Sequence, residues 1–194
     1  MPVFSYVSDR FIGISHSGPV TADAEGSVEL TDTEVTQLVD LIKENGGEYD
    51  VKKLDLQNKY PELYDKLDDA CRSMAYKAEY DFWVIEGYEN GYYDVDTNEV
   101  IALCEEKYGF KFEFDEKKFR EENGYEPDDD IEDSVDEARC DAFDNWVEEY
   151  RCSLDHDEEI EFLSEVFGLE PNVDDVDYEV EIPDAIVDMA VKGN

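Results

Sequence analysis

The sequence predicts an α+β fold that is predominantly helical, with a short antiparallel β-hairpin or a three-stranded sheet at the N-terminus. Apolar residues recur at helical spacing over most of the 194 residues, capping residues and glycines mark segment ends, and β-forming residues concentrate in the first 16 positions. Aromatic residues make up 13% of the chain, a high share for so acidic a sequence. We therefore expect a folded protein with a substantial core.

The N-terminal strands are predicted from two runs of β-forming residues. Residues 2–8 and 10–16 read as strands that pair through a turn at Ser8-Asp9. The residues from Ser17 to Gly26 have a loop composition. In the three-stranded alternative, Ser27–Leu30 adds a third, short strand.

Three helices come next in the chain. Thr31 and Glu34 form the pattern of a capping box, and Asn45-Gly46-Gly47 closes the helix that this box begins. A shorter helix is expected over Val51–Lys59. Pro61 then begins a long helix that keeps its apolar spacing to about Glu86.

The second half of the chain resembles the end of this long helix and the segment after it. Tyr80–Glu86 aligns with Phe143–Glu149, and Asp96–Phe110 aligns without a gap with Asp155–Leu169. Each unit reads as a tryptophan-bearing helix, a loop, and a capped helix closed by glycine. Two explanations stay open: repeated helical hairpins at 61–110 and 128–169, or convergence between two amphipathic helical pairs.

The remaining elements are short. Alternating apolar residues predict strands at 110–114 and 178–182, and helices are expected at 115–122 and 185–191. We divide the chain into an N-terminal part of strands and a capped helix, residues 1–60, and an acidic helical domain, residues 61–194.

The charge is extreme and uneven. The formal net charge is −39, and residues 101–194 alone contribute −25. Such a field repels nucleic acid and anionic membranes and attracts basic surfaces with fast, salt-sensitive association. The natural partners of the chain are therefore proteins that themselves bind nucleic acid.

Compartment and membrane signals point to a cytoplasmic protein. The four cysteines form no CxxC pair and have no histidine at zinc-ligand spacing, which favours reduced thiols packed in helices. The N-terminus has no basic and apolar signal pattern, and no apolar run approaches the length of a membrane span.

The stretch Asp128–Glu149 carries the strongest functional signal. Read as one helix, it places Ile131, Val135, Ala138, Ala142 and Trp146 on one side. The opposite side holds a stripe of carboxylates at steps of three and four residues: Asp130, Asp133, Glu137, Asp141, Asp144 and Glu148. Like charges at this spacing destabilise a helix by roughly 0.2 to 0.5 kcal/mol per pair. A role outside folding is therefore expected for the stripe.

The density of this charge suggests what it imitates. The stretch holds eleven acids and one arginine, and 22 helical residues span about 33 Å, or about 3.3 Å per net charge. One strand of duplex DNA carries a phosphate roughly every 3.4 Å. The predicted phosphate-mimicking residues are Asp128, Asp129, Asp130, Glu132, Asp133, Asp136, Glu137, Asp141, Asp144, Glu148 and Glu149.

Other chemistry is weakly represented. Asp94, Asp96, Asn98 and Glu105 match positions 1, 3, 5 and 12 of a calcium loop, but Glu99 replaces the glycine that the turn requires. The same residues suit a helix cap, which is the simpler interpretation. No nucleophile arrangement, phosphate loop or dinucleotide motif is present. We expect neither an enzyme nor a cofactor.

In net charge, size and aromatic-rich acidic helices, the chain resembles the acidic DNA-mimic inhibitors of phages and mobile elements, the anti-CRISPR and anti-restriction proteins. That resemblance implies blockade of a basic, DNA-binding groove on an RNA-guided or restriction nuclease in a bacterial cytoplasm. Two alternatives use the same composition: an immunity or chaperone-like protein that binds a basic toxin or DNA-binding protein, and a generic acidic or salt-adapted soluble protein.

Overall fold

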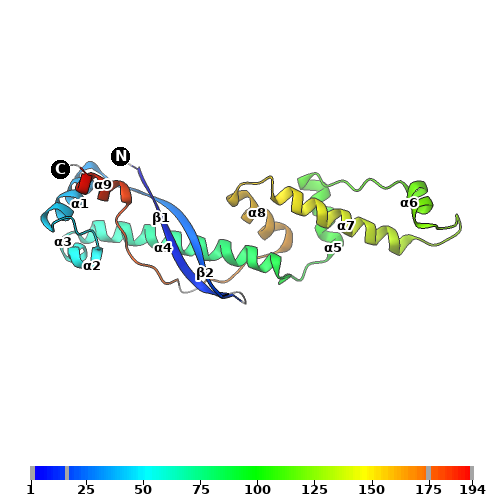
Figure 1. Cartoon of the computed structure of the whole chain (residues 1–194), viewed down its shortest axis with the longest axis horizontal. Coiled ribbons are helices and arrows are strands. Elements are labelled where there is room, and N and C mark those ends of the chain that lie inside the picture. The colour runs from blue at the N-terminus through cyan, green and yellow to red at the C-terminus, as the bar shows by residue number, and fades with distance from the viewer. Residues whose placement is uncertain (1–2, 16–17, 174–175, 193–194) are drawn as a thin grey trace. The chain divides into compact units, whose positions relative to one another are not determined.

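The computed structural model describes residues 3–15, 18–173 and 176–192, with side chains described from residue 26 onward. Most of these residues are helical, as predicted (Figure 1). The chain forms two compact units. The first comprises residues 1–83 and 171–194, and the second comprises residues 84–170.

The N-terminal strands differ from the prediction. The strand β1 (Val3–Ser15) pairs antiparallel with β2 (Gly18–Glu29). Ser8 and Asp9 lie inside β1, opposite Ala24 and Asp23, so the predicted turn at Ser8-Asp9 is wrong. The predicted loop after Ser17 and the separate third strand from Ser27 are wrong too, because β2 runs through both segments. His16, the predicted end of the second strand, lies outside the described residues.

Helix α1 (Asp32–Glu44) begins as predicted. The Glu34 N–H donates to Thr31 Oγ1 at 3.3 Å, and the Thr31 N–H donates to Glu34 Oε2 at 2.7 Å, which completes the capping box. The predicted helix over Val51–Lys59 is instead two short ones, α2 (Val51–Leu54) and α3 (Leu56–Lys59). They are separated by Asp55, whose φ of 56° is left-handed and ends a helix.

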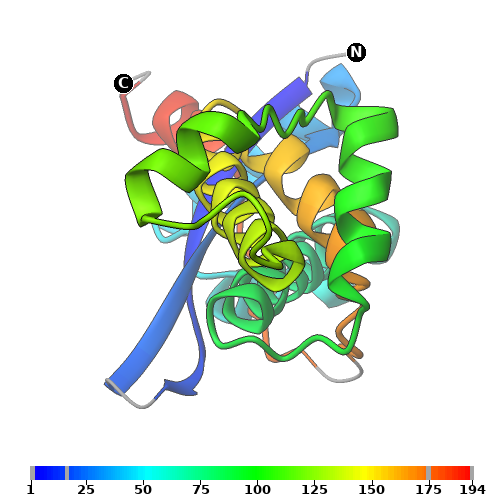
Figure 2. The same cartoon turned by 90° about the vertical axis from the view of Figure 1, so that its right-hand side faces the viewer.

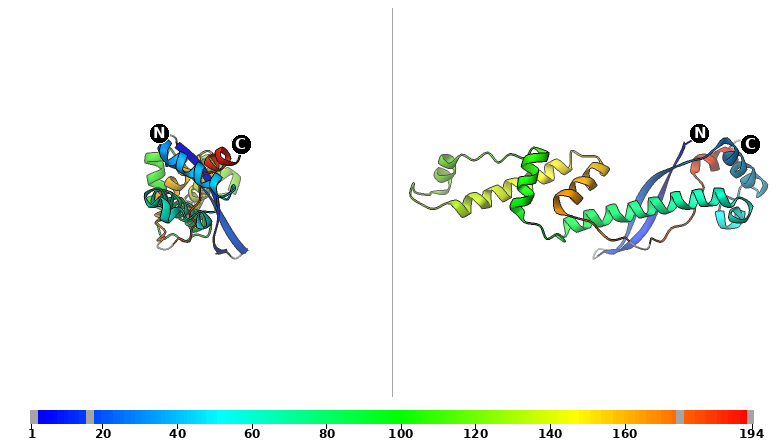
Figure 3. Two further views of the ribbon diagram at one scale, coloured as in Figure 1. Left: turned by 90° about the vertical axis from the view of Figure 1, so that its left-hand side faces the viewer. Right: turned by 180° about the vertical axis from the view of Figure 1, so that it is seen from behind.

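The core of the first unit joins both ends of its sequence. Helix α4 (Pro61–Glu89) supplies residues 61–83 to it, and α9 (Asp184–Lys192) packs against α1 (Figures 1 and 3). Leu38 and Ile42 of α1, Leu67 of α4 and Ile186 of α9 are fully buried in one cluster. These limits differ from the predicted division at residue 60, because the apolar faces of α1, α4 and α9 share this cluster.

The second unit is built from helices. They are the end of α4, α5 (Thr97–Leu103), the π-helical turn η1 (Cys104–Tyr108), α6 (Glu116–Asn123), α7 (Glu132–Arg151) and α8 (His156–Phe167). Helix α5 lies beside α8, as the end-on view in Figure 2 shows. Ile101, Cys104, Phe143, Val147 and Leu163 are buried between these helices.

Two predicted strands are absent from the described residues. Residues 110–114 and 178–182 have no strand partner there. In the first segment Phe114 packs on Phe119 of α6, with ring centroids 5.2 Å apart. In the second, Ile182 is buried in the core of the first unit. Alternating apolar residues therefore mark side-chain packing in these segments.

Positions that the predicted repeat aligns have the same local geometry. Asp96 and Asp155 both cap a helix through their side chains, and Gly109 and Gly168 both close one in the left-handed conformation. The residues that come after these glycines contact positions that the repeat does not align: Phe110 lies against Trp146 of α7, and Leu169 lies against Gly87 of α4. Common origin of the two hairpins stays a prediction.

The cysteines follow the prediction only in part. Cys71 and Cys104 are buried, and burial raises the pKa of the Cys104 thiol to about 11. Cys140 is half-buried and Cys152 is exposed beyond the end of α7, so the expectation of packed thiols is wrong for Cys152.

Candidate functional site

The acidic helix begins later than predicted. Helix α7 starts at Glu132, and Asp128–Asp130 lie in a turn before it. Local hydrogen bonds hold that turn: Asp129 Oδ2 accepts from the Glu126 N–H at 2.7 Å, and Asp130 Oδ1 accepts from the Glu132 N–H at 3.1 Å. Aspartate side chains that bond the backbone in this way compete with the helix, which explains the shifted start.

The buried side of α7 is also displaced from the predicted one. Phe143 and Val147 are the buried residues of the helix, and Ile131 just before it is buried as well. Val135, Ala138, Ala142 and Trp146, predicted to form the apolar face, are half-buried. Phe110 packs against both Phe143 and Trp146, with centroid distances of 5.3 Å. This aromatic contact draws the Phe143 side of the helix into the core.

All eleven predicted phosphate-mimicking residues are exposed. Among the described residues, only Glu148 of this set forms an ion pair, with Arg151 Nη1 at 3.3 Å from its Oε1. Its Oε1 also accepts the Tyr88 hydroxyl at 3.1 Å. The other ten carboxylates therefore make no ion pair within the described chain. We call these eleven residues the acidic face.

Within the helix, the charge is sparser than the sequence estimate. Helix α7 holds eight acids and two arginines, a net charge of −6 over 20 residues. At 1.5 Å per residue this is about 5 Å per net charge, more than the phosphate spacing along one DNA strand. The three aspartates of the preceding turn bring further charge close to the helix start. The acidic face is thus a helix and a turn together, which corrects the prediction of one 22-residue helix.

Five acids form the stripe on the helix itself. Asp133, Glu137, Asp141, Asp144 and Glu148 fall within an arc of about 80° at 100° per residue, spaced about 5.6 Å apart along the axis. The pKa of Asp144 is raised, first by its partial burial and then by the negative charges of Asp141 and Glu148. The stripe therefore contains mutual repulsion that the fold tolerates.

Two arginines tie α7 to its neighbours, and sequence reasoning did not find these contacts. Arg151 Nε donates to Glu159 Oε1 at 2.8 Å, and the guanidinium lies 4.5 Å from the centroid of the Tyr88 ring. Burial, followed by the hydrogen bond to Glu148, raises the pKa of Tyr88 to about 12. Arg139 Nη2 donates to Glu105 Oε1 at 3.0 Å. The contacts of Arg151 with Tyr88 and of Arg139 with Glu105 link residues far apart in sequence, so no local sequence pattern predicts them.

Of the four calcium-loop residues, Asp96 acts as a helix cap. Asp96 Oδ1 accepts from the N–H groups of Asn98 and Glu99 at 2.9 and 3.2 Å at the start of α5. Throughout the described ranges, no group of three or more His, Cys, Asp or Glu side chains could hold a metal ion. Asp94, Asp96, Asn98 and Glu105 are therefore not brought together as ligands.

No family model, curated protein or solved structure matches the chain significantly. In the part of the chain that the structure describes, no helix is both long enough and apolar enough to cross a membrane.

Proposed function

We propose that this protein is an acidic DNA-mimic inhibitor, whose acidic face occupies the basic nucleic-acid-binding groove of a bacterial nuclease in place of DNA. The observation that carries the proposal is the state of the ten carboxylates without an internal ion pair. They lie on a helix and turn that the core of the second unit holds in place, at an electrostatic cost to the fold.

The proposed mechanism is competitive. Lysine and arginine side chains that normally contact phosphates also donate charge-assisted hydrogen bonds to carboxylates. A carboxylate surface offers such a groove no phosphodiester bond, so the nuclease is occupied without turnover. In an RNA-guided nuclease, the arginines that read the short duplex motif are a suitable target.

Capture from a bacterial lysate tests this proposal. The full chain is immobilised at low salt, and bound proteins are eluted first with duplex DNA and then with rising salt. We expect nucleic-acid-binding proteins, nucleases among them, to leave with the DNA, because both ligands compete for one groove.

Matched variants locate the surface. Reversal of Asp133, Glu137, Asp141 and Asp144 to lysine should abolish capture. The control reverses four acids of the first unit outside the acidic face, Asp40, Glu44, Glu62 and Asp65, with the same change in net charge. Equal loss in both variants would mean that bulk charge, and not the acidic face, drives binding.

The alternative functions predict other outcomes. An immunity or chaperone-like protein would retain one partner that duplex DNA does not release. A generic acidic protein would elute ordinary metabolic enzymes, or nothing, and that result would contradict the proposal.

A further inference from the structure

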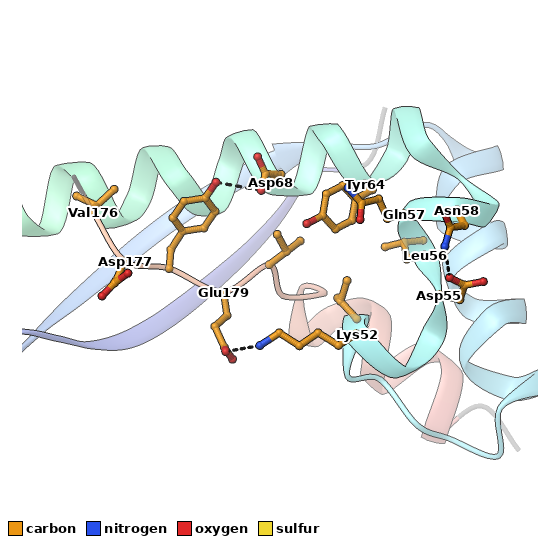
Figure 4. A pocket seen from close by; sticks show the side chains of 13 residues that line it. Lys52, Asp55, Leu56, Gln57, Asn58, Tyr64, Asp68, Val176, Asp177 and Glu179 are labelled. Atoms are coloured by element: carbon orange, nitrogen blue, oxygen red, sulfur yellow. Dashed lines mark hydrogen bonds and ion pairs between the residues drawn. The ribbon is translucent and has the colours of Figure 1, made fainter. Parts of the chain in front are cut away.

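Arg120 of α6 uses its charge differently from most basic residues of this chain. The common arrangement is a direct pair with a carboxylate, as in the cleft of the first unit drawn in Figure 4, where Lys52 Nζ lies 2.6 Å from Glu179 Oε1. The Arg120 guanidinium also bonds backbone carbonyls. Its Nη1 donates to the carbonyl oxygen of Glu126 at 2.9 Å and to that of Asp129 at 3.0 Å.

These two carbonyls belong to the turn that begins the acidic face. Asp128, Asp129 and Asp130, three of the eleven residues of the acidic face, lie within it. In the described chain, Arg120 is the one basic residue that bonds residues 126–130. Because its Nη1 reaches backbone oxygens, the turn is held while the three carboxylates stay without an ion pair.

Arg120 is itself fixed at both its side chain and its backbone. The side chain is 18% exposed, and its Nε donates to Glu116 Oε1 at 2.8 Å. The Arg120 carbonyl accepts the N–H of Gly124, whose φ of 74° lets the chain turn back after α6. It also accepts the N–H of Tyr125 at 3.0 Å. The guanidinium is therefore presented to the turn from a defined position.

The contacts of α6 lead to the start of the acidic face. The helix has eight residues and none is buried, so neither its length nor core packing accounts for its stability. The ring of Phe119 stacks on that of Tyr125, with centroids 6.0 Å apart. Tyr125 Oη lies 2.9 Å from Ser134 Oγ in the first turn of α7. Helix α6 thus braces both parts of the acidic face, the turn through Arg120 and the helix through Tyr125.

We propose that Arg120 is a positioning residue of the acidic face, which fixes the turn so that Asp128, Asp129 and Asp130 meet a cationic partner in one arrangement. A turn that is ordered in the free protein need not be ordered on binding, and this raises affinity. Arginine suits the role because its planar fork donates several hydrogen bonds at fixed angles, whereas lysine donates from one atom. The inference rests on the proposed function, since it takes cationic groups as the ligands of the acidic face.

Positioning and charge predict changes of opposite sign. Arg120→Gln makes the surface more negative, so charge alone predicts tighter binding of cations. Positioning predicts weaker binding, because the ligand must then order the turn. Arg120→Lys keeps the net charge, so a loss in that variant cannot come from charge. Lys117→Gln is the matched control, because Lys117 is an 86% exposed side chain of α6 that makes no bond to the turn.

The test is a titration of the ¹⁵N-labelled full chain with L-arginyl-L-arginine amide, followed by NMR. In the native chain we expect saturable shift changes at the amides of residues 128–130 and of residues 141–148. In both Arg120 variants, the dissociation constant fitted at 128–130 should rise about fivefold, the loss expected when one ordered side chain is released. The constant fitted at 141–148 should stay unchanged, which also shows that the variants are folded. Lys117→Gln should raise neither constant.

Four outcomes would overturn the proposal. They are an unchanged constant at 128–130 in Arg120→Lys, tighter binding there in Arg120→Gln, an equal rise at 128–130 and 141–148, and no saturable change at 128–130 in the native chain. The equal rise would mean that Arg120 supports the whole unit and not the turn. Failure of duplex DNA to release captured proteins would instead contradict the proposed function and leave the positioning role intact.

Discussion

At the scale of single residues, Arg151 is the contact that most clearly links α7 to its surroundings. Its side chain is 13% exposed and pairs with Glu159, which is 21% exposed. Removal of the guanidinium leaves the Glu159 carboxylate partly buried without its cation, and also removes the contact with the Tyr88 ring.

We therefore expect Arg151→Gln to lower the free energy of unfolding by roughly 1.5 to 3 kcal/mol, measured by urea denaturation. Lys192→Gln is the matched control, because Lys192 and its partner Asp188 are largely exposed. An exposed pair contributes about 0 to 1 kcal/mol. Similar losses in the two variants would contradict the role assigned to Arg151.

Replacement of Asp144 is expected to have the opposite effect on stability from replacement of Arg151. Its pKa is raised in the folded protein, so between the unfolded and folded pKa values the folded state binds more protons. Stability from this group is therefore present at low pH and is lost as pH rises through the folded pKa.

Asp144→Asn should accordingly stabilise the protein at pH 7, by roughly 0.2 to 0.5 kcal/mol for each relieved repulsion with Asp141 and Glu148. The gain should shrink as pH falls toward the ordinary pKa of aspartate, where the native carboxyl is protonated. Unfolding curves at several pH values test this, and a gain that grows on acidification would refute the sign.

At the scale of elements, the capped helices are the part that sequence patterns predict well. Thr31 and Glu34 lie three residues apart, so their hydrogen bonds depend on local geometry alone. The same holds for Asp155 and Glu158 at the start of α8.

Thr31→Ala should lower the free energy of unfolding by about 1 kcal/mol, because the side-chain acceptor for the Glu34 N–H is lost. Thr31→Ser keeps the hydroxyl and should retain most of that stability. Thermal or urea denaturation distinguishes the two variants, and equal losses would show that the cap contributes little.

Elements that depend on distant contacts were predicted poorly. The alternation at 178–182 resembles a strand, but Ile182 is buried against helices that no local pattern identifies. Asp55 splits the expected helix at 51–59 because its backbone is left-handed. Aspartate can adopt this conformation but usually does not, so the residue type alone does not predict the break. The shifted start of α7 likewise depends on aspartate bonds to the backbone of a turn.

At the scale of the whole molecule, the charge follows the division into two units. The second unit holds 31 acids and 7 basic residues, and the first holds 24 and 9. The sequence alone shows an excess of acids over residues 101–194, and residues 101–170 of that range lie in the second unit. It did not predict the unit limits, because the first unit includes the C-terminal segment, which returns to the first helices.

We propose that the acidic face takes the place of DNA on its target. The most direct measurement is a competition in which the protein displaces labelled duplex DNA from the purified target, followed by fluorescence anisotropy at 0.15 M salt. We predict full displacement by the native chain and by the first-unit control variant, and displacement at least roughly tenfold weaker after reversal of Asp133, Glu137, Asp141 and Asp144. A ternary complex of target, DNA and inhibitor, or equal displacement by the reversed and native chains, would contradict the claim.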